Sequence, residues 1–214
     1  MVRQRVAEAA ARAGRDPASI TLIAVSKTAP ADRVREAMAA GAGDLGENYV
    51  QEALAKMEAL GGDARWHMIG HLQTNKVRHT IGRFSMIHTV DSLRLAEEIS
   101  RRSAASGHIQ DVLVELMMGD APTRTGADLS LLPSLVDSIL ALPGIRLRGL
   151  MGVPPWGVDP RPHFAALRET LKMLPDDARS VLSMGMSGDY EAAIVEGATH
   201  VRVGTAIFGP RERR

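Results

Sequence analysis

A lysine stands at the end of an apolar run that is typical of a buried strand, and its position could support chemistry. In "TLIAVSKTAP", residues 21–30, Lys27 follows directly after that run. An ammonium group removed from water loses its proton more easily, and the neutral amine can attack an aldehyde to form a Schiff base. The alternative is a lysine that packs its stem on apolar surface and keeps its charge in water. The residues alone leave both interpretations open.

Two turns further along the chain are typical of phosphate sites. Ser187 and Gly188 follow an apolar run and open a short helix in "SMGMSGDYEAAI". Backbone N–H groups at the start of a helix suit a phosphate, although serine also caps ordinary helices. Gly204 and Thr205 form a second turn of this kind in "VRVGTAIFG". Two such turns favour a phosphate site over ordinary capping.

Three further features have both a structural and a functional interpretation. Arg202 lies between two valines of an apolar run, so it would either donate to a ligand or pair with a core carboxylate. His67 and His71 have the i, i+4 spacing of metal ligands on a helix, but a strand is predicted here, so we expect no metal.

The "GAGDLG" stretch, residues 41–46, matches the glycine spacing of a dinucleotide-binding loop. It follows a helix and leads into a strand, which is the reverse of the order in such a loop, so we expect no dinucleotide here.

The elements that would position these residues alternate between short apolar runs and helical patterns. Eight apolar runs lie near residues 21–26, 44–46, 66–69, 86–90, 111–116, 147–152, 180–184 and 199–204. Strands that alternate with helices indicate a parallel sheet, and continuous apolar runs indicate strands covered on both faces. The pattern predicts an α/β protein with a single (β/α)8 TIM barrel, one domain over residues 1–214, and an extra N-terminal helix over 2–13. An open doubly wound sheet is the alternative.

A barrel would gather the polar residues at one mouth, because chemistry in such folds sits at the C-terminal ends of the strands. The residues predicted at these ends are Lys27, Glu47, Asn48, His71, Ser187, Gly204 and Thr205. The Gly- and Pro-rich loops 117–126 and 151–160 would form part of the rim, or they are plain surface loops.

Composition excludes several classes of protein. Lys and Arg number 26 against 25 Asp and Glu, so a net charge of +1 gives no reason to expect nucleic acid or an anionic membrane as partner. The absence of cysteine excludes disulfides, Cys-based zinc sites and thiol nucleophiles. The N-terminal residues are charged and lack the apolar central region of a secretion signal. No apolar stretch is as long as the roughly 18 residues that a membrane-spanning helix needs. We expect a cytoplasmic monomer.

Six stretches resemble the pyridoxal phosphate homeostasis proteins. They are "AVSKT" (24–28), "GENYVQEALAK" (46–56), "WHMIGHLQTNK" (66–76), "LRGLMG" (147–152), "SMGMSGDYEAAI" (183–194) and "VRVGTAIFG" (201–209). They occur in the same order as in that family and together extend over nearly the whole chain. The resemblance implies a fold-type III barrel that binds pyridoxal 5′-phosphate (PLP) and is similar to the N-terminal domain of alanine racemase.

The resemblance also implies roles for particular residues. Lys27 matches the lysine that holds PLP as an internal aldimine, and Arg202 matches the arginine that faces the pyridine nitrogen. The positions that match phosphate-binding residues are Ser187, Gly204 and Thr205. The positions expected near the cofactor are Asn48, His67 and Met186.

The function implied is intracellular PLP (vitamin B6) and amino-acid homeostasis without substantial catalysis. Arg202 stays charged, so it would leave the ring nitrogen unprotonated and weaken the electron sink that PLP enzymes use. Alanine racemase has a second acid/base, a tyrosine from a C-terminal domain, whereas this chain ends at Arg214. The alternatives are a weak PLP-dependent amino-acid racemase and a sugar-phosphate enzyme with Lys27 as its Schiff base. Besides PLP, the candidate partners are PLP-dependent apoenzymes and amino acids.

Overall fold

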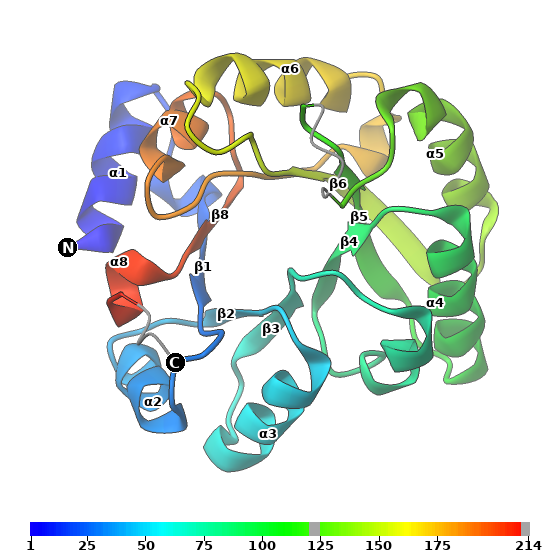
Figure 1. The fold of residues 1–214 in the computed structure, drawn as a ribbon, viewed down its shortest axis with the longest axis horizontal. Helices are drawn as coiled ribbons and strands as arrows, with labels where there is room; N and C mark the ends of the chain where they lie inside the picture. Colours follow the sequence, from blue (N-terminus) through cyan, green and yellow to red (C-terminus); the bar gives the residue numbers. More distant parts are fainter. Residues whose placement is uncertain (120–124, 211–214) are drawn as a thin grey trace.

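Eight parallel strands close into a barrel in the computed structural model of the protein, which describes residues 1–119 and 125–210 (Figure 1). The strands pair in chain order, and β8 pairs back to β1. This closure confirms the predicted (β/α)8 fold and rules out the open doubly wound sheet. Within the rim loop 117–126, residues 120–124 lie outside the described part of the chain.

The observed strands correspond closely to the eight apolar runs of the sequence. They are β1 (Thr21–Val25), β2 (Asp44–Glu47), β3 (Arg65–Met68), β4 (Met86–Val90), β5 (Gln110–Leu116), β6 (Ile145–Gly152), β7 (Val181–Ser183) and β8 (His200–Val203). The strand β2 has the least apolar sequence of the eight, yet all its residues are buried. Its two acidic residues are buried because they have partners inside the protein, as described below.

Helices surround the barrel on its outer side (Figure 1). The α-helices are α1 (Val2–Arg12), α2 (Ala31–Ala39), α3 (Val50–Leu60), α4 (Leu93–Ala105), α5 (Leu132–Ala141), α6 (Arg161–Leu171), α7 (Tyr190–Val195) and α8 (Thr205–Phe208). The 3-10 helices are η1 (Pro17–Ser19), η2 (Thr74–His79), η3 (Leu129–Leu131) and η4 (Asp176–Ala178). The predicted N-terminal helix is α1, which lies against α7, where Arg5 and Arg12 pair with Glu191.

The apolar residues form two separate groups, one outside the sheet and one inside the barrel. The larger group fills the layer between the strands and the helices and is almost entirely aliphatic. The smaller group comprises Met86, Leu113, Met151 and Val181, one residue from each of four consecutive strands. Because side chains alternate along a strand, these residues point into the barrel, while their neighbours along each strand face the helices.

Two local predictions about helix starts are wrong. The stretch "DSLRLAEEIS" after β4 predicts a helix with Asp91 as its N-cap, but the N-cap residue is Ser92, and Asp91 instead approaches His71 with 3.5 Å between Oδ2 and Nδ1. The turn at Ser187 does not open a helix directly, since α7 begins at Tyr190 with Asp189 at its N-cap. In both cases the carboxylate or hydroxyl found a partner on another segment, which a local capping pattern does not reveal.

Within residues 1–119 and 125–210, no helix combines the length and the apolar character that crossing a bilayer requires. Over the same ranges, no three histidine or acidic side chains are grouped so that they could hold a metal ion. His67 and His71 diverge, because the first is buried inside the barrel and the second is exposed at the end of β3.

Candidate functional site

The backbone is fixed on both sides of Lys27, which is half-buried two residues after the end of β1. On one side, the carbonyl of Ser26 accepts a hydrogen bond of 2.5 Å from Lys56 Nζ. On the other, the N–H of Thr28 donates to Glu52 Oε1 over 2.6 Å. Thr28 has φ 65°, a left-handed conformation that a β-branched residue seldom adopts. The surrounding contacts therefore hold the turn in a shape that it would not prefer alone.

The side chains that fix this turn form a buried ionic cluster, here called the lysine clamp (Glu47, Glu52 and Lys56). Lys56 Nζ lies 2.7 Å from Glu47 Oε1 and 2.7 Å from Glu52 Oε1. The hydroxyl of Ser26 also donates to Glu47 Oε1, over 2.7 Å. Burial raises the pKa of Glu47, and the hydrogen bonds from Lys56 and Ser26 oppose that rise. The three oxygen acceptors satisfy the ammonium of Lys56, which compensates for removing it from water.

Sequence reasoning missed the role of Lys56. The signal was present in "GENYVQEALAK", where Glu52 and Lys56 have the i, i+4 spacing of a helical ion pair. That spacing ordinarily indicates an exposed pair on a helix surface. The structure instead turns this face of α3 toward β2, so that the lysine reaches Glu47 at the end of that strand.

The two turns predicted to bind phosphate lie in direct contact. The hydroxyl oxygen of Ser187 accepts hydrogen bonds from the N–H of Gly204 over 3.1 Å and from the N–H of Ala206 over 3.3 Å. The two N–H groups therefore converge on one point between the last two βα loops. A serine hydroxyl that accepts two hydrogen bonds keeps its own hydrogen to donate. The serine hydrogen is therefore available to a phosphate, and the two N–H groups would reach a phosphate once Ser187 releases them.

A glycine allows the first of these loops to pack closely. Gly185 has φ 88°, and a Cβ atom at this position would lie 2.5 Å from Cβ of Ala193 and 2.9 Å from Cα of Tyr190. Only glycine combines this backbone conformation with so close an approach. The loop after β7 is thereby held against α7, which positions the Ser187 turn.

Arg202 is buried within β8, with only 4% of its surface exposed. Its Nη1 donates to Ser183 Oγ over 2.7 Å, and its Nη2 donates to the carbonyl oxygen of Gly152 over 3.1 Å. Both of these acceptors are neutral. Burial lowers the pKa of Arg202 to about 10, against the opposing charges of Glu115 and Asp189, so the guanidinium stays protonated at neutral pH.

The remaining predicted residues differ in how they relate to the mouth. Asn48 follows β2 and packs against Gly70, where a Cβ atom would lie 2.4 Å from the Asn48 carbonyl oxygen. Met186 is 37% exposed and precedes Ser187. His67 lies inside the barrel, and both its ring nitrogens already have partners, Asp44 and His88. Direct contact of a His67 nitrogen with a ligand would require those bonds to break, so the prediction that His67 lies near the cofactor stays a prediction of proximity.

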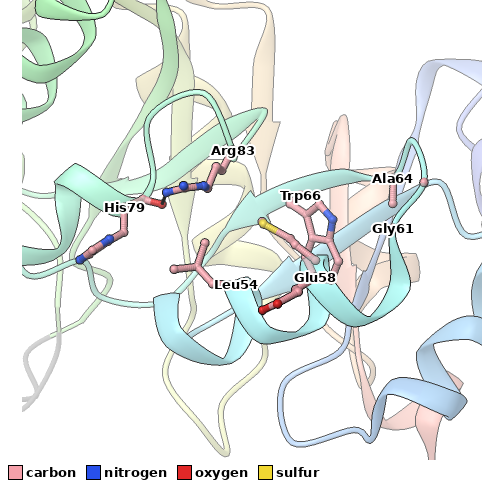
Figure 2. A pocket seen from close by; sticks show the side chains of 9 residues that line it. Leu54, Glu58, Gly61, Ala64, Trp66, His79 and Arg83 are labelled. Carbon is pink, nitrogen blue, oxygen red and sulfur yellow. Dashed lines mark hydrogen bonds between the residues drawn. The ribbon is translucent and has the colours of Figure 1, made fainter.

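A separate pocket of about 540 Å³ lies away from these residues (Figure 2). Leu54 and Glu58 of α3, Trp66 of β3, and Arg83 line it. None of the residues predicted from the sequence to bind a ligand lines this pocket, so it is distinct from the candidate site at the mouth.

Comparison with known proteins gives the class of barrel to which this fold and site correspond. The family model described as alanine racemase, N-terminal domain, matches residues 2–212. The chain is therefore a barrel of the alanine racemase N-terminal type, as its closed eight-stranded sheet and strand-end lysine indicate.

The chain belongs, more narrowly, to the pyridoxal phosphate homeostasis protein family. It is 46% identical to the pyridoxal phosphate homeostasis protein of Pseudomonas aeruginosa, over 99% of this chain and 93% of the relative. Identity to the corresponding protein of Aquifex aeolicus is 43%, over 99% and 96%. The structure of PipY from Synechococcus elongatus with PLP bound matches with a TM-score of 0.82 at 38% identity, over 98% of this chain and 100% of PipY.

The lysine clamp makes a testable contribution to stability. Lys56→Met leaves the buried Glu47 carboxylate without its cation, and we expect the free energy of unfolding in urea to fall by about 3–5 kcal/mol. The control is Lys172→Met, since Lys172 pairs with Glu169 but is 63% exposed, and its removal should cost about 0–1 kcal/mol. Equal losses for the two variants would contradict a clamp that holds the turn.

The histidines inside the barrel predict a loss of stability in mild acid. Burial lowers the pKa of His200 to about 4 and that of His88 well below its ordinary value, so the unfolded chain binds more protons as the pH falls from about 6.5 toward 4. Between pH 7 and pH 5, His200 alone should cost about 2 kcal/mol. Urea titrations at both pH values should show a smaller loss for His200→Phe than for the wild type. An identical loss would show that His200 does not titrate as described.

Proposed function

We propose that this protein binds PLP through Lys27 and serves intracellular PLP (vitamin B6) and amino-acid homeostasis without substantial catalysis. The observation that carries the proposal is the contact between two distant loops, in which N–H groups of Gly204 and Ala206 meet the hydroxyl of Ser187. The same end of the barrel carries the fixed turn of Lys27. The names of its relatives and the PLP-bound PipY structure support this interpretation.

Each part of the cofactor would have a matching group in the site. The phosphate would be bound by Ser187, Gly204 and Thr205. The N–H groups of Gly204 and Ala206 would turn from the Ser187 hydroxyl to the phosphate, which makes Ala206 an additional donor. The amine of Lys27 would attach the cofactor covalently through its aldehyde. Arg202 would donate toward the ring nitrogen, while Asn48 and Met186 would lie beside the cofactor. His67 would act indirectly, since its ring nitrogens are engaged inside the barrel.

The charge of Arg202 supports a binding role over a catalytic one. When bound to an enzyme, PLP supplies an electron sink that is strongest with its ring nitrogen protonated. A guanidinium only donates hydrogen bonds, so Arg202 offers no base that would keep a proton on that nitrogen. Racemisation also needs a second acid or base. Of the two tyrosines, Tyr190 is buried, its ring lying 5.7 Å from the guanidinium carbon of Arg5, and Tyr49 is 62% exposed.

The proposal extends to the setting in which the protein works. Residues 1–214 would form one PLP-binding domain that acts as a cytoplasmic monomer. PLP-dependent apoenzymes and free amino acids would be its exchange partners, because an amine can displace Lys27 from a bound aldehyde. The net charge of +1 supports partners other than nucleic acid or an anionic membrane.

Lys27→Ala tests the attachment. The purified wild-type protein should show a visible band at roughly 420 nm with PLP, and borohydride reduction followed by peptide mapping should place the label on Lys27. Lys27→Ala should lose the band while its free energy of unfolding stays within about 0.5 kcal/mol of the wild type. Lys76→Ala is the matched control and should keep the band. A label on Lys76 or Lys172 would refute the assignment.

The absence of substantial catalysis has its own test. Wild-type protein loaded with PLP should racemise each of the chiral amino acids with a turnover below about 1 s⁻¹, the lower end of ordinary enzymes. Chiral chromatography after incubation in heavy water measures both racemisation and exchange of the α-hydrogen. Turnover above this value with any amino acid would make the protein a racemase and contradict the proposed role.

A further inference from the structure

Five buried polar side chains form a continuous chain of hydrogen bonds across the barrel interior. Arg202 Nη1 lies 2.7 Å from Ser183 Oγ, which lies 2.9 Å from His88 Nδ1. His88 Nε2 lies 3.0 Å from His67 Nδ1, and His67 Nε2 lies 3.0 Å from Asp44 Oδ1. These residues come from β8, β7, β4, β3 and β2, and none is more than 8% exposed. We refer to this set as the polar relay.

The two ends of the polar relay have fixed hydrogen-bonding roles. A guanidinium only donates and an ionised carboxylate only accepts, so Arg202 starts the relay and Asp44 ends it. Ser183 accepts from Arg202 and donates to His88 Nδ1. His88 then donates from Nε2 to His67 Nδ1, and His67 donates from Nε2 to Asp44. In this direction of the relay both histidines are neutral and carry their hydrogen on Nε2. The reverse direction puts hydrogen on His88 Nδ1 and on both nitrogens of His67, with Ser183 accepting two hydrogen bonds, and histidine ¹⁵N spectra distinguish the two.

The neutral state of His88 agrees with its surroundings. Burial lowers the pKa of His88 well below its ordinary value, and the positive charge of Arg202 also lowers it. The ring of His200 lies 6.2 Å from those of His67 and His88, measured between centroids. Its Nδ1 is 3.0 Å from Thr199 Oγ1, so it stands beside the polar relay without a hydrogen bond to it.

The Asp44 end of the polar relay is anchored at the start of β2, opposite the mouth. Arg65 holds Asp44 with two hydrogen bonds, from Nε over 2.8 Å and from Nη2 over 2.6 Å. Burial alone would raise the pKa of Asp44, but the hydrogen bonds from His67 and Arg65 hold it well below its usual range. The carboxylate is therefore ionised at neutral pH and fixes the direction of the relay.

We propose that the polar relay orients Arg202 for the ligand at the mouth, which makes Ser183, His88 and His67 positioning residues of the binding site. The inference rests on the proposed function in taking that ligand to be PLP. Ser183 offers its lone pair to Arg202 because its own hydrogen points to His88. If His88 carried its hydrogen on Nδ1, the Ser183 hydrogen would lose its acceptor in the relay. Ser183 Oγ would then accept from both His88 and Arg202, and its hydroxyl would turn toward another acceptor, which alters the contact that fixes Nη1.

The first arm of the test uses the protein without PLP. Histidine side-chain ¹⁵N spectra at pH 7 should show His67 and His88 as neutral rings with hydrogen on Nε2. His67→Phe removes the acceptor of His88 Nε2, so the hydrogen of His88 should move to Nδ1. His200→Phe is the matched control and should leave His88 unchanged. A wild-type His67 or His88 that is charged, or that carries its hydrogen on Nδ1 alone, would overturn the polar relay.

The second arm measures PLP binding by the same variants. His67→Phe and Ser183→Ala should each weaken PLP binding about tenfold or more and shift the visible band, whereas His200→Phe should stay within about twofold of the wild type. Binding by His67→Phe equal to that of His200→Phe would overturn the positioning role. A wild-type protein that takes up no PLP would refute the proposed function, and the histidine resonances of the ligand-free protein would still decide the relay. Ser183→Ala serves if His67→Phe does not fold.

Discussion

The pairing of β1 with β8 is the contact on which the site depends. It aligns Ala24 with Val203 and closes the sheet. Lys27, near the start of the chain, thereby reaches the same mouth as Gly204, near its end. Gly204 packs close to β1, since a Cβ atom there would lie 3.4 Å from the Val25 carbonyl oxygen. An open sheet of the same strands would leave the amine and the N–H donors apart, so closure is a condition of the chemistry.

Around this mouth the protein buries two cations in different ways. Lys56 is held by the carboxylates of Glu47 and Glu52, which satisfy its charge and leave it a structural role. Arg202 has neutral acceptors, the hydroxyl of Ser183 and a backbone carbonyl oxygen. A buried cation whose hydrogen-bond acceptors are neutral keeps a stronger field for a ligand than one bonded directly to carboxylates. By this difference in acceptors, Lys56 shapes the site, whereas Arg202 would face the cofactor.

Much of the fold was predictable, because the eight continuous apolar runs and the helical patterns between them can be recognised without knowing which strands pair. The shared mouth followed from the barrel, which placed Lys27, Ser187 and Gly204 on strand ends. The polar relay was not predictable from local patterns, since a histidine in the apolar run "MIHTV" does not reveal which strand provides its partner. The role of Lys56 was hidden for the same reason. These contacts depend on strand register and side-chain direction, which only the closed barrel defines.

A crystal structure of the protein grown with PLP would test the central claim most directly. We expect density for the phosphate group against Ser187, Gly204 and Ala206, continuous density between the cofactor and Lys27 Nζ, and the ring nitrogen facing Arg202. Cofactor bound elsewhere, for example in the pocket beside Trp66, or phosphate at the mouth with Lys27 turned away from the ring, would contradict the account.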